Sequence, residues 1–220
     1  MTSEFVWRLE AVLDLYGAPP DPTRPVICLD EYPLALQSTP RGDLPCASHR
    51  PRREDYEYDR HGRASLFIVF NPATGWREIV VLERHRRQEF AAVIQRLTTV
   101  HYPEATEIRL VCDNLNTHTP AAFYEVCSPE EARALTERVS FHYTPKHGSW
   151  LNMAEIEWAI LTRECLSRRL PDIATVQAEV DAWVAQRNAA QATVHWRFTT
   201  TDARRWLERC YPRPTEQDPS

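Results

Sequence analysis

The chain has 220 residues, of which 43% are hydrophobic, so it is long enough for one large domain with a buried core. Its net charge of −5 argues against a protein whose only task is to coat nucleic acid, although local basic patches remain compatible with DNA binding. No run approaches the roughly 18 apolar residues of a membrane span, and the acidic N-terminus does not resemble a secretory leader. We therefore expect a cytoplasmic protein that has no membrane partner.

The six cysteines are scattered along the chain without any C-x-x-C spacing. Cys28 and Cys112 stand in apolar runs, where a thiol behaves as a small hydrophobic group. Both a zinc site and structural disulfides are therefore disfavoured.

The first part of the chain predicts one helix followed by antiparallel strands. Residues 4–16 carry apolar side chains at helical spacing, and the proline-rich stretch GAPPDPTRP ends this helix. The run VICLDEYP predicts a buried strand that stops at Pro33. Residues 37–53 look like a polar loop, and a hairpin that turns at His61-Gly62 is expected after it. The turn NPATGW then leads into a further strand, REIVVLE.

The rest of the chain alternates helices with strands. Residues 87–103 predict a helix, EIRLVCDNLN a strand, residues 120–138 one or two short helices, and VSFHYTP another strand. Helices follow at 151–169 and 173–190, the second of them packed into the core. Thr201 is expected to cap a last helix. This order predicts an α/β fold with a mixed five-stranded sheet flanked by helices.

Three carboxylates stand at comparable places in this pattern. Asp30 ends the first strand, Asp113 ends the fourth, and Glu155 opens the helix after the fifth. One acid at a strand end is often only a turn cap, but three at one sheet edge favour a functional site, because a buried carboxylate is costly unless it is paired or metal-bound. Clustered carboxylates raise one another's pKa, and a hard divalent cation such as Mg²⁺ or Mn²⁺ relieves this repulsion. Two such ions about 4 Å apart support phosphodiester chemistry.

Three blocks of the sequence, CLDEYP, VCDNLNTHTP and FHYTPKHGSWLNMAEIEW, resemble the signature blocks of a transposase family. It is the bacterial, mariner-related insertion-sequence group of the IS-six-thirty type, and the resemblance runs from about Phe5 to Tyr211. It implies a DDE catalytic domain with a ribonuclease-H-like fold, which cleaves DNA and transfers strands with two Mg²⁺ or Mn²⁺ ions. By this resemblance Asp30, Asp113 and Glu155 form the catalytic, metal-binding triad.

The resemblance also implies a domain organisation and partners. Residues 1–24 form a helix and linker, residues 25–211 the catalytic domain, and residues 212–220 a disordered tail. The expected partners are transposon-end and target DNA, on which a homodimer assembles in the bacterial nucleoid. A nuclease of the same fold without strand transfer, and an inactive remnant that only binds DNA or a partner, remain as alternatives.

Other residues of these blocks are candidates for supporting the triad or contacting DNA. Asn152 shares a helix face with Glu155, whereas Glu31 and Glu157 are expected to be neighbours and not metal ligands, because they face away. The remaining candidates, for which ordinary turn roles stay open, are Asn114, Asn116, His118, Lys146 and His147.

Three basic clusters could contact DNA non-specifically or form solvated faces. They are residues 49–53, residues 84–87, and the set Arg163, Arg168 and Arg169. Trp150 could stack on a base, although a hydrophobic anchor is the stronger interpretation.

The chain departs from the family pattern in two respects. The family's LDE is commonly followed by lysine, and here it is followed by Tyr32. Family members also carry helix-turn-helix modules before the catalytic domain, whereas this chain begins only a short distance before Asp30. We therefore expect those modules to be missing from this polypeptide, either because a separate polypeptide supplies them or because the gene is truncated.

Overall fold

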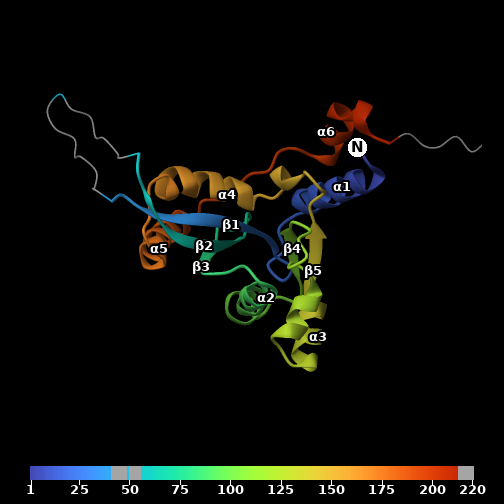
Figure 1. Cartoon of the computed structure of the whole chain (residues 1–220). Helices are drawn as coiled ribbons and strands as arrows, with labels where there is room; N and C mark the ends of the chain where they lie inside the picture. Colours follow the sequence, from blue (N-terminus) through green and yellow to red (C-terminus); the bar gives the residue numbers. More distant parts are fainter. Residues whose placement is uncertain (41–48, 50–55, 213–220) are drawn as a thin grey trace, which may run out of the picture.

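The computed structural model describes residues 1–40, 49 and 56–212. At its centre is a five-stranded sheet of order β3-β2-β1-β4-β5, in which β2 is antiparallel to β1 and β3, whereas β4 and β5 run parallel to β1 (Figure 1). The predicted mixed five-stranded sheet flanked by helices is confirmed. The strands are β1 (Val26–Ser38), β2 (Asp59–Phe70), β3 (Arg77–Leu82), β4 (Ile108–Cys112) and β5 (Val139–Tyr143).

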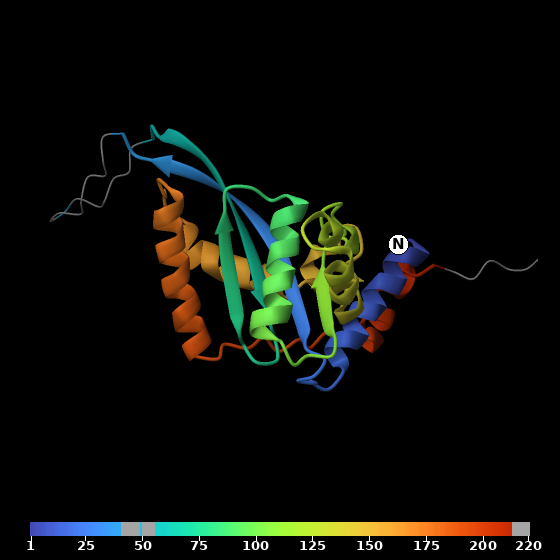
Figure 2. The ribbon, with the colours of Figure 1, turned by 90° about the horizontal axis from the view of Figure 1, so that it is seen from below.

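Helices cover both faces of the sheet (Figures 1 and 2). The helices are α1 (Ser3–Gly17), α2 (Arg87–Arg96), α3 (Pro129–Arg138), α4 (Ala154–Leu161), α5 (Ile173–Ala189) and α6 (Thr200–Trp206). A π-helical turn extends α2 over Leu97–His101 and another extends α4 over Thr162–Leu166, and 3₁₀ turns span Pro120–Glu125, Ser149–Leu151 and Glu208–Cys210. None of the helices in the described part is long and apolar enough to cross a membrane.

Two hydrophobic cores lie on opposite faces of the sheet. One is built around α1, α4 and α5 and includes Leu9, Trp158 and Val180, while the other is built around α2 and α3 and includes Phe90 and Leu135. In α5 the buried side chains are Val176, Val180 and Trp183, so the prediction that this helix faces the core is confirmed.

Strand β1 does not stop at Pro33, so that prediction is wrong. Pro33 is paired with Ser65 of β2, and β1 continues to Ser38. The parallel strand β4 accompanies β1 only from Val26 to Cys28. Because β2 is the only strand beside this part of β1 among the described residues, the missing N–H of proline need not cost a ladder hydrogen bond. Most of the predicted loop at 37–53 lies outside the described residues.

The predicted hairpin turn at His61-Gly62 is also wrong, because β2 is continuous there. The register between β1 and β2 shifts at Leu36, so His61 and Gly62 together lie opposite that one residue. This is a β-bulge, and the φ angle of 96° at Gly62 is one that glycine adopts without strain. A glycine inside a strand pattern here indicates a bulge and not a chain reversal.

Two helix boundaries differ from their predictions. The helix expected at 151–169 begins only at Ala154, after the 3₁₀ turn. In α6 the N-cap is Thr199 and not Thr201, because the Thr199 hydroxyl accepts from the Asp202 N–H and Asp202 in turn accepts from the Thr199 N–H. The predicted tail lies outside the described residues from 213 onward.

Candidate active site

The fold brings Asp30, Asp113 and Glu155 to the same edge of the sheet. Strands β1 and β4 are parallel neighbours, so Asp30, just beyond their paired segment, and Asp113, the first residue after β4, lie at corresponding ends. Glu155 is the second residue of α4, which packs on β1. All three side chains are partly exposed.

Electrostatics link the three acids. The pKa of Asp30 is raised to about 7, first by burial, then by the negative charge of Glu155, and further by the charge of Asp113. These carboxylates therefore lie close enough to repel one another, and a bound cation would lower the free energy of the ionised cluster.

The donor atoms at this edge fit a hard divalent cation, because carboxylate oxygens are the ligands such ions prefer. Within the described ranges, however, no group of three or more His, Cys, Asp or Glu side chains is arranged to hold a metal ion. Asp113 is hydrogen-bonded to His118 in this arrangement.

His118 bridges two carboxylates beside the cluster. Its Nδ1 lies 2.6 Å from Oδ1 of Asp113 and its Nε2 lies 2.8 Å from Oε1 of Glu31, and the ring is 1% exposed. Burial lowers the pKa of His118, but the hydrogen bonds to Asp113 and Glu31 outweigh it and raise the pKa to about 9. Because both partners are acceptors, the imidazole donates from both nitrogens and carries a positive charge.

The link from Glu31 to Asp113 is one that sequence reasoning missed. Strand alternation sends Glu31 to the face opposite Asp30, which made it only a neighbour of the site. The histidine that joins it to Asp113 comes from the loop after β4, and the Tyr143 hydroxyl fixes that loop by donating to the His118 carbonyl at 2.7 Å. The signal in the sequence was the histidine five residues after Asp113 in DNLNTH.

Asn152 connects the two elements that carry Asp30 and Glu155. Its Nδ2 donates to the carbonyl of Leu29 at 2.8 Å, and its Oδ1 accepts from the N–H of Ala154 at 3.2 Å. The side chain is 2% exposed. Asn152 therefore fastens the start of α4 to β1 at the residue before Asp30.

Glu157, two residues after Glu155, points into the protein interior. It is fully buried, with Oε2 2.9 Å from Nε of Arg77 and Oε1 2.7 Å from Nη2 of Arg187. Arg77 is fully buried as well and also donates to the carbonyl of Ala192. This ion-pair network joins α4 to β3 and α5, and no pattern in the sequence predicted it.

The remaining candidates occupy exposed positions. Asn114 and Asn116 are exposed in the turn after Asp113, and Lys146 and His147 are exposed in the turn before α4. A cavity of about 720 Å³ is lined by Lys146 and His147 together with Asp113 and Asn114. Trp150 is 47% exposed and packs against Trp196 and Phe198, with ring centroids 6.3 and 5.9 Å away.

The basic clusters are partly engaged within the protein. Arg87 is paired with Glu125, Arg168 with Glu179, and Arg169 donates to Thr39. Of the cluster at 49–53, only His49 belongs to the described residues.

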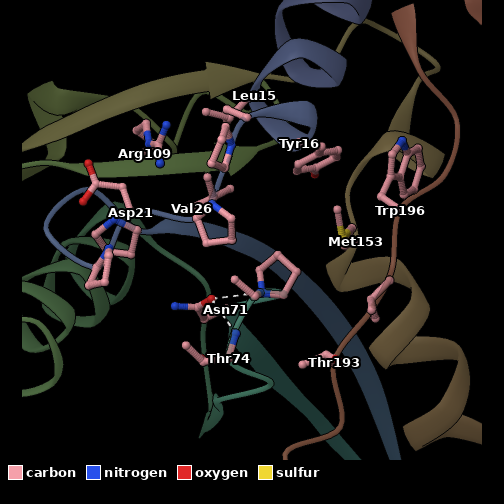
Figure 3. Close-up of a pocket in the computed structure, with 18 of the residues that line it drawn as sticks. Leu15, Tyr16, Asp21, Val26, Asn71, Thr74, Arg109, Met153, Thr193 and Trp196 are labelled. Carbon is pink, nitrogen blue, oxygen red and sulfur yellow. Dashed lines mark hydrogen bonds between the residues drawn. The ribbon is translucent and has the colours of Figure 1, made fainter.

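A second cavity, of about 450 Å³, lies at the opposite ends of β1 and β4 (Figure 3). Its wall includes Tyr16, Val26, Asn71, Arg109 and Trp196, and Asn71 accepts there from the N–H of Thr74 at 3.2 Å. Asp21 is the one carboxylate among its described lining residues. The described lining of this cavity therefore offers no acid cluster.

Three solved structures are similar to this chain. The Mos1 mariner paired-end complex with Mn has 15% identity and a TM-score of 0.57, and the match covers 96% of this chain and 62% of that chain. The Mos1 paired-end complex with Mg has 16% identity and a TM-score of 0.56, with the same coverages of 96% and 62%. The Mos1 strand transfer complex has 13% identity and a TM-score of 0.57, and the match covers 82% of this chain and 53% of that chain. At these identities the likeness shows the fold, which is ribonuclease-H-like. The chain spans about three-fifths of the length of the first two structures.

A comparison with curated proteins found no match. The family model for the DDE superfamily endonucleases matches residues 25–177, which include Asp30, Asp113 and Glu155. Because this match covers more than half of the sequence, the chain belongs to the DDE superfamily endonucleases.

Proposed function

We propose that this chain is the catalytic domain of an insertion-sequence transposase, which cleaves DNA and joins the cleaved strand to target DNA with divalent metal ions. The observation that carries the proposal is the placement of Asp30, Asp113 and Glu155 at one edge of the sheet, where burial and the charges of the other two acids raise the pKa of Asp30 to about 7. Membership of the DDE superfamily endonucleases supports it, as does the likeness to transposase complexes that contain Mn or Mg.

Asp30, Asp113 and Glu155 would hold the metal, as two Mg²⁺ or Mn²⁺ ions in the proposed site. Such ions supply Lewis acidity to phosphodiester oxygens and lower the pKa of water. The chain's own contribution is to orient the ligands. The charged His118 and Glu31 orient Asp113, and Asn152 fixes the start of α4 relative to β1.

The proposed reaction has two steps. In the first, water attacks the phosphorus, the phosphodiester P–O3′ bond breaks, and a 3′-hydroxyl and a 5′-phosphate result. In the second, that 3′-hydroxyl attacks a phosphodiester of the target strand, whose own 3′-oxygen leaves. Both steps move charge at the phosphoryl oxygens, so positioning and electrostatics can supply most of the catalysis.

The proposed organisation agrees with the family resemblance. Residues 1–24 form a helix and linker, residues 25–211 the catalytic domain, and residues 212–220 a tail. The proposed partners are transposon-end and target DNA in the bacterial nucleoid and a second copy of the chain assembled on that DNA.

Nicking of supercoiled plasmid tests the proposal. With Mg²⁺ or Mn²⁺ the native chain should convert the plasmid to open circles, and EDTA should abolish this. Asp113→Asn should reduce the rate at least ~100-fold, because the swap keeps the shape and removes a metal-binding charge. The matched control is Asp181→Asn, which replaces an aspartate of α5 that bonds only Gln177 among the described residues.

Nicking that survives in Asp113→Asn would contradict the assigned triad. No nicking by a folded native chain would favour the inactive remnant. A strand-transfer assay with pre-cleaved 3′-hydroxyl ends then separates a transposase from a nuclease that stops after cleavage.

A further inference from the structure

The cavity beside Asp113 has one wall that the proposed function leaves unused. Helix α1 supplies this wall, and the other lining residues come from the turn between β5 and α4 and from the start of the loop after β4. Helix α1 lies outside residues 25–177, which match the family model. The α1 residues in the wall, with the N-cap, are Thr2, Glu4, Phe5 and Arg8.

Two cationic side chains, Lys146 and Arg8, line this cavity together with the carboxylates of Glu4 and Asp113. Lys146 is the only lysine among the 220 residues. It is exposed, and it has no hydrogen-bond or ion-pair partner within the described part of the chain. Arg8 is held on the other wall by Glu4 at 3.0 Å and by the Tyr143 ring, whose centroid lies 5.7 Å from its guanidinium carbon. The cavity also meets the first turn of α1, where the helix dipole is positive.

The turn that carries Lys146 is held in an uncommon conformation. The N–H of Gly148 donates to the carbonyl of Pro145 at 2.8 Å, which closes the turn around Lys146 and His147. His147 has a φ of 65°, in the left-handed region that residues with a Cβ seldom adopt. Such strain persists where the surrounding structure maintains it, and it is concentrated at functional sites.

We infer that this cavity binds a single strand of DNA next to the acid cluster, and that α1 is part of the substrate site. Lys146 and Arg8 contact successive phosphates, while Phe5 and Leu115 offer apolar surface to a base. The volume of about 720 Å³ lies in the range of small-ligand pockets, ~300–1,000 Å³. A nucleotide of one strand fits such a space. This inference rests on the proposed function, because it takes the ligand to be DNA.

The single lysine makes a direct test possible. The native chain is treated with formaldehyde and borohydride in Ca²⁺ buffer, with and without saturating oligothymidylate, and methylation of Lys146 is followed by mass spectrometry. A free lysine peptide in the same tube reports reagent activity. We expect DNA to slow methylation of Lys146 at least ~5-fold without slowing that of the peptide. Equal rates with and without DNA would overturn the inference.

Binding measurements add a second test. The fluorescence anisotropy of labelled oligothymidylate should give a Kd that rises ~5–20-fold in Lys146→Gln and in Arg8→Gln, with the salt slope smaller by about 0.7 in each. The matched control is Arg133→Gln, since Arg133 forms the same type of helical pair with Glu137 on the distant helix α3. Unchanged affinity in both cavity variants would overturn the inference.

The two proposals fail in different ways. Neither binding test requires cleavage. A chain that protects Lys146 on DNA but never nicks plasmid contradicts the proposed function and leaves the cavity assignment intact. A chain that nicks plasmid while Lys146 stays unprotected contradicts the cavity assignment alone.

Discussion

Glu155 and Glu157 lie two residues apart on α4 and belong to opposite kinds of charged site. Glu157 is fully buried between Arg77 and Arg187, so the protein itself supplies the cations that neutralise it. Glu155 is partly exposed and faces Asp30, whose pKa its charge helps to raise. At one site the negative charge is matched by arginines, and at the other it is in excess.

This difference between Glu155 and Glu157 shows that one short helix contributes to stability at one residue and to the acid cluster at the other. The buried network holds α4 in place against β3 and α5. The unmatched carboxylates at its start destabilise the folded chain until a cation binds. Removing one negative charge from the buried network and one from the acid cluster should therefore change stability in opposite directions.

The largest effect is expected at the buried network. Glu157→Gln leaves Arg77 buried without its counter-charge, and breaking such a pair costs about 3–5 kcal/mol of unfolding free energy. Urea unfolding measures it. The control Glu137→Gln breaks an exposed helical pair with Arg133 and should cost less than about 1 kcal/mol. Similar losses in the two variants would contradict the contrast between the sites.

Asp30→Asn should act in the opposite direction. The folded-state pKa of Asp30, about 7, lies above its unfolded value of about 4, so the folded chain binds more protons between these pH values and loses stability as the pH rises through them. A pKa difference of three units corresponds to about 4 kcal/mol of unfolding free energy. The amide of the new asparagine still loses hydration when it is buried, which offsets part of this gain. We therefore expect the variant to be more stable than the native chain by about 2 kcal/mol at pH 8 and equally stable at pH 4.

Metal addition sharpens this prediction. Thermal unfolding at pH 8 should show that Mn²⁺ raises the Tm of the native chain and raises that of Asp30→Asn much less, because ligands stabilise only the state that binds them. An Asp30→Asn chain that is less stable than the native one at pH 8 would contradict a raised pKa of Asp30 in the folded state.

A smaller effect is expected at Glu31. Glu31→Gln removes one of the two carboxylates that raise the pKa of His118, so that pKa should fall from about 9 toward its ordinary value in an NMR titration. Metal-dependent nicking should slow about 10-fold, as when a partner of a metal ligand is lost, and far less than in Asp113→Asn. An unchanged pKa of His118 would mean that Asp113 alone maintains it.

The positions of the acids that follow apolar strands along the chain were predictable from the sequence. Because β1 and β4 contain apolar runs that end in acids, the sequence alone assigns Asp30 and Asp113 to one edge of the sheet. Pro33 and Gly62 were misread because local rules for proline and glycine ignore which strands lie alongside. Arg77 could not be recognised as buried, since its partner Glu157 is distant in sequence and an arginine at the start of a strand is usually exposed.

The contact of α1 with α6 has a consequence for how the protein is made. Glu10 of α1 is paired with Arg204 of α6 and accepts from the hydroxyl of Tyr211, and Asp14 accepts from Thr200. During synthesis, α1 leaves the ribosome long before α6, so its contacts are completed only when α6 has emerged. The bond from Arg77 to Ala192 likewise forms late. A nascent chain that already carries Asp30, Asp113 and Glu155 therefore still lacks these contacts of α1 and of Arg77.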